Sequence, residues 1–318
     1  MATTSLDDDL KKLLIGLPMQ KSDEPLVSII MNCYNGEKYL NEALDSIIQQ
    51  TYKNWEVIFW DNLSTDKSAD IYKSYDDLRL KYFIATEHTL LYEARNYAIK
   101  KASGEFYAFL DVDDWWAPEK LEKQIPLFSD SEVGLVYGNL WYENEQNRSR
   151  KILYKKLLPS GRILGDLLKN YVVGLVTIVI RRITFESLHH PFNSEYHLIG
   201  DFDCVIRIAV DWNINCVQEP VAHYRWTGDN GTNKNKERQL QEIEHWYNAM
   251  KQHPVISIDN NYLMDAKNKL LYMKTKLEIE NKHYFNTLSL INEIPMGLMK
   301  LKLLAICIIP KKILSYFA

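Results

Sequence analysis

The sequence predicts an α/β fold with a mainly parallel sheet flanked by helices and a helical C-terminal extension. Two observations predict it. From Pro25 onward, short apolar runs that end in polar turns alternate with helical stretches, and beyond Asn233 the pattern is helical to the end. At 318 residues the chain exceeds the size at which one hydrophobic core usually stops growing. One large domain with an appendage, or two modest domains, is therefore expected.

Four apolar runs near the N-terminal end predict four strands, and a helical pattern follows each of the first three. In the first helical pattern Leu40, Leu44 and Ile47 fall on one face, and the third ends near Ala102, before Gly104. Helices between successive strands favour right-handed crossovers and a parallel sheet covered on both faces. The runs span residues 26–31, 55–60, 80–84 and 106–110.

The pattern becomes less regular after residue 150. It predicts a helix near 164–168, a strand around 176–180, a helix beginning at Asp201 and a strand at 216–224. Residues 223–232, rich in Gly, Asn and Asp, read as a loop. Two roles are open for this loop. Its arginine and aromatic side chains could close over phosphate and sugar, or it could be an ordinary exposed loop.

Bulk composition narrows the function classes. A formal net charge of −4 gives no basic field for nucleic acid. The four cysteines are far apart without a C-x-x-C pair, which indicates reduced thiols and a cytoplasmic protein. Residues 7–18 begin with acids and have too short an apolar core for a signal peptide, so a mobile tail or docking helix is expected.

Polar turns follow all four predicted strands. In a parallel sheet, ligands bind outside the carboxyl ends of the strands, so these turns are expected to converge on one crevice. They span residues 32–36, 61–64, 86–91 and 111–114.

The last of these turns carries three carboxylates in four positions, Asp111-Val112-Asp113-Asp114. If residues 111–113 are extended, Asp111 and Asp113 point the same way. Two close carboxylates repel unless one is protonated or a cation lies between them, and hard oxygen ligands suit Mg²⁺ or Mn²⁺. The alternative is that these are turn and capping residues ahead of the helix signalled at 117–120.

Two long segments resemble one enzyme family. VSIIMNCYNGEKYLNEALDSIIQQTYKNWEVIFWDNLSTDKS and EARNYAIKKASGEFYAFLDVDDWWAPEKLEKQ are similar to the family-2 glycosyltransferases, inverting enzymes with the Rossmann-like GT-A fold. The resemblance is dense over residues 25–130 and thinner to about residue 230. It implies a nucleotide-sugar donor, UDP-linked by preference, a glycan or lipid-linked glycan acceptor, and Mn²⁺ or Mg²⁺ as cofactor.

The resemblance also implies roles for residues at the four turns. Asp113 would coordinate the cation between the donor phosphates, and Asp111 would approach the ribose or the metal. Arg95 would lie near the same acidic edge, or form an ion pair that fastens its helix to the motif. The remaining donor-binding positions would be Tyr34 and Asn35 beside the nucleotide, and Asp61 and Asn62 at the base and ribose.

A base is needed to accept the proton of the acceptor hydroxyl. The family supplies an Asp that opens a helix in the second half, and Asp201 matches that position, with Asp203 as the second candidate. Gly200 replaces the common acidic partner. An alternative role for Asp201 is a helix N-cap. Asn62 and Tyr92 also depart from the family, at positions where relatives often have Asp and Gly.

The resemblance implies a domain organisation. Residues 1–24 would be a tail, 25–232 the GT-A catalytic domain, and 233–318 a helical region. Within the catalytic domain, 25–130 would bind the nucleotide and 131–232 the acceptor. Residues 298–314 contain four lysines and no acids, which is typical of an amphipathic anchor on the inner face of the cytoplasmic membrane, or of a helix packed on the protein itself or on a second subunit.

Three other classes are weighed against this interpretation. A sugar nucleotidyltransferase is disfavoured because the first turn is not the glycine-rich, Arg-containing loop of that class. A nicotinamide dehydrogenase is disfavoured because the sequence lacks G-x-G-x-x-G. A noncatalytic binding or scaffolding subunit with the same fold remains open, since Gly200 and Tyr92 depart from the family.

Overall fold

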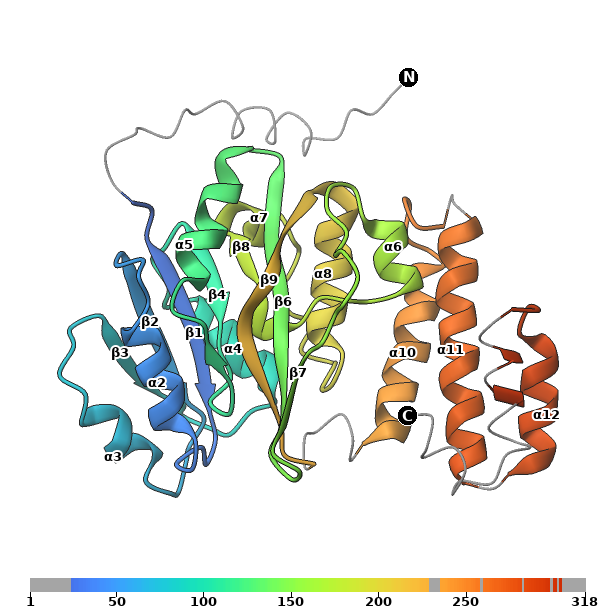
Figure 1. Cartoon of the computed structure of the whole chain (residues 1–318), viewed down its shortest axis with the longest axis horizontal. Helices are drawn as coiled ribbons and strands as arrows, with labels where there is room; N and C mark the ends of the chain where they lie inside the picture. The colour runs from blue at the N-terminus through green and yellow to red at the C-terminus, as the bar shows by residue number, and fades with distance from the viewer. Residues whose placement is uncertain are drawn as a thin grey trace. The chain divides into compact units, whose positions relative to one another are not determined.

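The structure is a computed structural model of the chain (Figure 1) and describes residues 24–228, 235–257, 260–281, 283–297, 300–301 and 303–304. The expected tail (1–24) and the expected anchor (298–314) lie almost wholly outside the described residues. The chain divides into two compact units. The first comprises residues 1–163, 172–197 and 207–227, and the second comprises 164–171, 198–206 and 228–318.

The first unit is built on a nine-stranded sheet with the order β3-β2-β1-β4-β8-β6-β9-β5, in which β7 pairs with β6. The strands are β1 Val27–Cys33, β2 Trp55–Asp61, β3 Leu80–Ile84, β4 Phe106–Phe109, β5 Trp115–Trp116, β6 Val133–Asn144, β7 Ser149–Ile152, β8 Val179–Arg181 and β9 Asn213–Trp226.

The four strands expected from the apolar runs, β1 to β4, are all present and pair in parallel. The rest of the sheet is mixed, because β8 pairs antiparallel with β4 and β6, while β6 and β9 are parallel. The helical segments of this unit are α2 Leu40–Ile48, α3 Ser68–Lys73, α4 Leu91–Ile99, α5 Lys120–Gln124, the 3₁₀ turns Ile125–Ser129 and Leu175–Thr177, and α7 Arg182–Glu186.

All seven residues of β1 are buried, as expected for a central strand covered on both faces. At its amino end, Ser28 Oγ donates a 2.5 Å hydrogen bond to Glu56 of β2, which also pairs with Lys81. Burial alone would raise the pKa of Glu56, but the hydrogen bonds from Lys81, Ser28 and Ser103 outweigh it and hold the pKa at about 2. This buried carboxylate is therefore fully paired and structural.

Two strands differ from the sequence expectation. The twelve-residue β6 was not predicted, and β9 continues to Trp226, so residues 223–226 are strand and not loop. The two strands pair with each other along most of their length, with register shifts near Gly138 and Asn139. Residues 229–234, the remainder of the expected loop, lie outside the described residues.

The second unit is helical. Helix α11 packs against α6, α10 and α12, and Phe202 makes an edge contact with Trp246 at 4.8 Å between ring centroids. Among the described residues no helix is both long and apolar enough to span a bilayer. Its helices are α6 Leu164–Lys169, the first part of α8 Gly200–Asp211, α10 Lys236–Met250, α11 Asn260–Glu280 and α12 Tyr284–Glu293.

Candidate functional site

Hydrogen bonds join the turns that follow β1 and β2. Asn35 has a positive φ of 54°, a conformation that Asn tolerates better than most residues. Its backbone N–H donates to Ser64 Oγ at 3.0 Å, and its Oδ1 accepts from Thr65 N–H at 2.8 Å. The N–H of Gly36 donates to Ser68 Oγ at 2.9 Å. The structure therefore brings together the first two predicted turns, with Asn35 as the bridge.

The side chains of Asp61 and Asn62 are both engaged by the protein. Asp61 is 1% exposed and accepts hydrogen bonds from the Tyr82 hydroxyl at 2.6 Å and the Ser64 N–H at 2.7 Å. Asn62 Nδ2 donates to the carbonyl of Thr89 at 2.8 Å. Both residues shape this edge of the sheet, and their contact with a base or ribose stays a prediction.

Tyr34 and His88 form an exposed pair of rings at this edge. Tyr34 is 54% exposed, and the ring centroids are 4.4 Å apart. His88 Nδ1 lies 2.9 Å from the carbonyl oxygen of Asn62, which ties the third predicted turn to the second. No sequence motif marks His88, which was expected only as a member of the turn at residues 86–91.

The acidic segment is a turn, so the condition under which Asp111 and Asp113 would point the same way, an extended backbone, is not met. The N–H of Asp114 donates to the carbonyl of Asp111 at 3.1 Å, which closes the backbone immediately after β4. The structure also assigns the three carboxylates different environments. Asp114 is buried, and its Oδ1 accepts a 2.8 Å hydrogen bond from the backbone N–H of Arg225. Burial and the neighbouring Asp113 raise the pKa of Asp114 well above its usual range.

Asp111 and Asp113 are the carboxylates suited to a ligand. Asp111 forms an ion pair with Arg95 at 2.5 Å, and Arg95 is 2% exposed beneath it. The ion pair that the sequence analysis considered for Arg95 is therefore present. Burial first, and the charge of Asp111 second, raise the pKa of Asp113 to about 6.

This donor set fits a divalent cation. Within the described part of the chain no group of three or more His, Cys, Asp or Glu side chains could hold a metal ion. Mg²⁺ typically takes one or two protein carboxylates and completes its shell with substrate phosphates and water. Asp111 and Asp113 supply that number, and a cation would stabilise the ionised form of Asp113 that burial disfavours.

Arg225 is a site residue whose role the sequence analysis did not foresee. Its Nε donates to the carbonyl of Asp113 at 2.9 Å, and its guanidinium also pairs with Glu42. The guanidinium carbon lies 4.4 Å from the ring centroid of Tyr39 and 4.5 Å from that of Trp115. Arg225 thus holds the acidic turn to β9. In the sequence, Arg225 stands out only as an arginine between aromatic residues in a segment that was expected to be a loop.

Asp201, the predicted base, lies in the second unit. It is the second residue of α8, which begins at Gly200, so Asp201 lies inside the helix and is not its N-cap. Its neighbour Asp203 is buried, whereas Asp201 is partly exposed. The assignment of Asp201 as the base remains a prediction.

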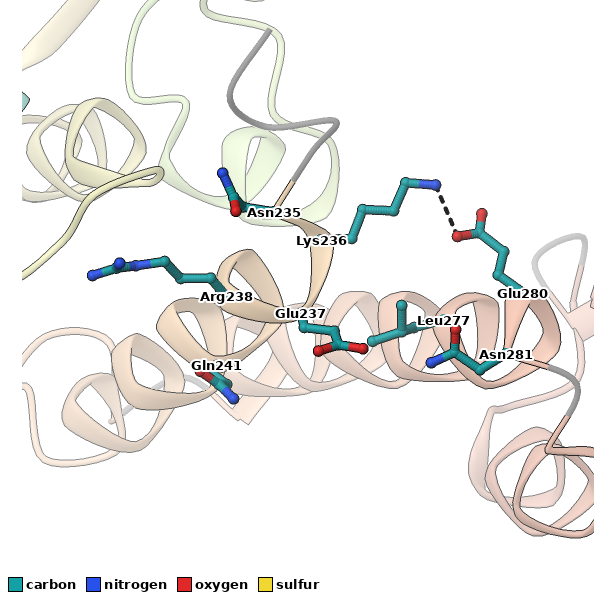
Figure 2. Close-up of a pocket in the computed structure, with 8 residues that line it drawn as sticks. All are labelled: Asn235, Lys236, Glu237, Arg238, Gln241, Leu277, Glu280 and Asn281. Carbon is teal, nitrogen blue, oxygen red and sulfur yellow. Dashed lines mark hydrogen bonds and ion pairs between the residues drawn. The ribbon is translucent and has the colours of Figure 1, made fainter. Parts of the chain in front are cut away.

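The second unit also contains a cavity of about 500 Å³ between α10 and α11. Figure 2 shows Lys236 paired with Glu280 across it, at 2.8 Å. The predicted site residues do not line this cavity, and it contributes nothing to the chemistry described above. Its lining consists of Asn235, Lys236, Glu237, Arg238, Gln241, Leu277, Glu280 and Asn281.

The chain is similar to known glycosyltransferases in sequence. A glucosyltransferase of Escherichia coli, UDP-Glc:alpha-D-GlcNAc-diphosphoundecaprenol beta-1,3-glucosyltransferase WfgD, is 36% identical over 61% of this chain and 74% of its own length. The putative teichuronic acid biosynthesis glycosyltransferase TuaG of Bacillus subtilis is 32% identical over 53% of this chain and 67% of its own.

Solved structures share the fold at low identity. The mannosyltransferase PcManGT of Pyrobaculum calidifontis, in complex with GDP-Man and Mn²⁺, is 19% identical with a TM-score of 0.64, and the match covers 96% of this chain and 88% of that one. TarS of S. aureus (residues 1–349), in complex with UDP-GlcNAc, is 18% identical with a TM-score of 0.63, over 85% and 81% of the two chains.

The model of the family "Glycosyl transferase family 2" matches residues 28–189, half of the chain, which includes β1 to β8 and the acidic turn. Together with the two relatives above, this match confirms the resemblance seen in the sequence. The chain belongs to the family-2 glycosyltransferases and is a transferase with the GT-A fold.

Proposed function

We propose that the chain is a metal-dependent, inverting glycosyltransferase that moves a sugar from a UDP-sugar to a hydroxyl of a lipid-linked or surface glycan of the bacterial envelope. The observation that supports it most is the turn after β4, where Asp111 lies close enough for its charge to raise the pKa of Asp113. The relatives point the same way, since one is named for a UDP-Glc donor and a diphosphoundecaprenol acceptor, and another for teichuronic acid biosynthesis.

The proposed donor site is the carboxyl edge itself. The exposed ring of Tyr34 and the joined turns at Asn35 and Asp61 would receive the nucleoside. Asp113, with Asp111, would hold the cation. When bound, Mn²⁺ or Mg²⁺ neutralises charge that grows on the departing diphosphate. Arg95 fixes Asp111 in place through its ion pair.

The proposed reaction is a single displacement. The acceptor hydroxyl oxygen attacks the anomeric carbon from the face opposite the diphosphate, and the carbon–oxygen bond to the diphosphate breaks, which inverts the configuration. The carboxylate of Asp201 accepts the hydroxyl proton. Holding donor and acceptor in line replaces a bimolecular encounter with a positioned one. With a lipid-linked acceptor, the enzyme would act at the inner face of the cytoplasmic membrane.

A panel of nucleotide sugars tests the proposal. The purified full-length protein is incubated with each donor and Mn²⁺, Mg²⁺ or EDTA, and the released nucleoside diphosphate is measured. Slow metal-dependent release from a UDP-sugar is expected. Release that EDTA does not affect would overturn metal dependence, and release only from a GDP-sugar would overturn the UDP assignment. Tight donor binding without release, even with lipid-linked acceptors added, would favour the noncatalytic binding subunit.

A further inference from the structure

Two neighbouring side chains at the carboxyl edge of the sheet carry buried polar atoms without hydrogen-bond partners among the described residues. Asn32 of β1 is 8% exposed, and within the described part of the chain neither its Oδ1 nor its Nδ2 has a partner. Trp60 of β2 is its register partner, and the buried Nε1–H of Trp60 is also unpartnered among those residues. Such atoms are rare in folded proteins because each loses its water without a replacement, so each needs an explanation.

Asn32 and Trp60 point to the same face of the sheet. Partner positions on adjacent parallel strands share a face, and side chains two apart along a strand do so too. Four residues back, the partners Ser28 and Glu56 lie on that face and are joined by their 2.5 Å hydrogen bond. The ring of Trp60 stacks on Tyr97 of α4 at 5.5 Å. The unpartnered groups therefore lie on the face that α4 covers.

The same helix reaches the acidic turn. Arg95 of α4 binds Asp111, and β1 lies directly between β2 and β4 in the sheet. Asn32 is the penultimate residue of β1, and Asp111 follows β4 by two residues. The unpartnered carboxamide is thus near the carboxyl end of the strand between β2 and β4, on the face from which Arg95 reaches Asp111, at the edge where the donor is proposed to bind.

The chemistry of the unpartnered atoms limits what they can bind. A carboxamide offers an acceptor oxygen and two N–H donors, and the indole offers one more donor. A phosphate has only acceptors and would leave Oδ1 unpaired, and a metal ion cannot use N–H groups. The neutral nucleoside carries donor and acceptor atoms together, in the ribose hydroxyls and on the base edge.

We propose that Asn32, assisted by Trp60, binds the neutral nucleoside portion of the donor. This inference rests on the proposed function and deepens it. In the free protein the carboxamide is a local instability, and the nucleoside supplies the missing hydrogen bonds when it binds. Residues that serve binding at the expense of stability are common at functional sites.

The test is the substitution Asn32→Leu, which keeps the branching and size of the side chain and removes its polar atoms. We expect Tm to rise by about 2 °C, because an apolar group suits an unpartnered buried position better. We expect the Kd of UDP with Mn²⁺, measured by calorimetry, to rise at least about tenfold. If Asn32 had only a structural role, the substitution would lower both Tm and the affinity for UDP.

A matched control is Asn139→Leu. Asn139 is also buried, but its Nδ2 donates to the carbonyl of Tyr154 at 2.7 Å and its Oδ1 accepts from the Tyr154 N–H at 3.2 Å. The control should lower Tm and leave the Kd of UDP unchanged. Should Asn32→Leu fail to fold, Trp60→Phe offers a second variant, since it keeps a ring against Tyr97 and removes only the N–H. Its Kd should rise about threefold, and an unchanged Kd would then overturn the inference.

Two further arms separate the outcomes. The first arm repeats the Kd measurement with 2′-deoxy-UDP. If Asn32→Leu then binds as well as wild type, the contact is assigned to the 2′-hydroxyl of the ribose. If the variant still binds more weakly than wild type, the contact is assigned to the base or the 3′-hydroxyl. If wild-type protein and Asn32→Leu bind UDP with the same Kd, this inference alone is overturned. Wild-type protein that binds neither UDP nor GDP in the presence of Mn²⁺ overturns the proposed function and the inference together.

Discussion

The two acidic segments of the molecule, residues 111–114 and 201–203, look alike in sequence and differ in structure. The first is a turn in which each carboxylate has a different environment: Asp111 is ion-paired, Asp113 has a pKa that burial and Asp111 raise to about 6, and Asp114 is buried and bonded to the backbone of Arg225. The second is the start of a helix, with Asp201 partly exposed and Asp203 buried. The comparison teaches that the backbone, more than the number of acids, decides which carboxylate can take a ligand.

The strongest test of the first segment is Asp113→Ala. Loss of this carboxylate should reduce Mn²⁺-dependent release of nucleoside diphosphate on the order of 10³-fold, because charge on the leaving group is no longer neutralised. Asp76→Ala, which alters an exposed carboxylate of the same unit, is the control. If Asp113→Ala retained activity within threefold of wild type, the cation site would have to be placed elsewhere.

The second segment is tested by Asp201→Asn. Turnover should fall by about 10²- to 10⁴-fold, the usual contribution of a general base, while the Kd of the donor stays within about twofold. Asp203→Asn should chiefly lower Tm, since Asp203 is buried. The two roles would be exchanged if Asp203→Asn, and not Asp201→Asn, abolished turnover of a folded protein.

A smaller effect is expected where Arg225 holds the acidic turn. Arg225→Met removes the hydrogen bond to the Asp113 carbonyl, and the Mn²⁺ concentration for half-maximal activity should rise about tenfold. Arg150→Met is the matched control, because Arg150 also stacks on a tryptophan, Trp141, at 3.9 Å. The control should stay within about twofold of wild type. Equal effects in both variants would show that stacking, and not the contact with the turn, matters.

The smallest expected effect is that of pH on cation binding. Burial and Asp111 raise the pKa of Asp113 to about 6, so above that pH the carboxylate is ionised and below it a proton must be displaced. Affinity for Mn²⁺ should therefore fall about fourfold between pH 7 and pH 5.5. Titration followed by electron paramagnetic resonance measures it. An affinity that does not change over this range would mean that Asp113 is ionised throughout.

Much of the first half of the fold follows from local sequence signals. The strands β1 to β4 are predictable because each is a short apolar run with a turn behind it. The strand β6 was missed because its partner β9 is about 80 residues away, and pairing at that distance leaves no local pattern. For residues 111–114 the sequence leaves an extended backbone and a turn both open, and only the hydrogen bond from Asp114 decides for the turn.

The carboxylates of the candidate site were predictable from the sequence, but the residues that hold them in place were not. The acidic turn after the fourth strand indicated Asp111 and Asp113, the family resemblance indicated Arg95, and the structure pairs Arg95 with Asp111. Arg225 could not be placed, because its contact with Asp113 depends on the register between β5 and β9. Asn32 gave no signal at all, since an unpartnered carboxamide is visible only once its neighbours are known.

The contacts of Arg225 have a consequence for biosynthesis. It reaches back 111 residues to Asp114 and 183 residues to Glu42, so a chain emerging from the ribosome completes β1 to β4 long before it can secure the acidic turn. Arg95 can pair with Asp111 early, but the contacts of Arg225 with Asp113 and Asp114 must wait until residue 225 has been synthesised, and contacts so distant in sequence form slowly. Catalytic competence would thus arise late, after most of the polypeptide has left the exit tunnel.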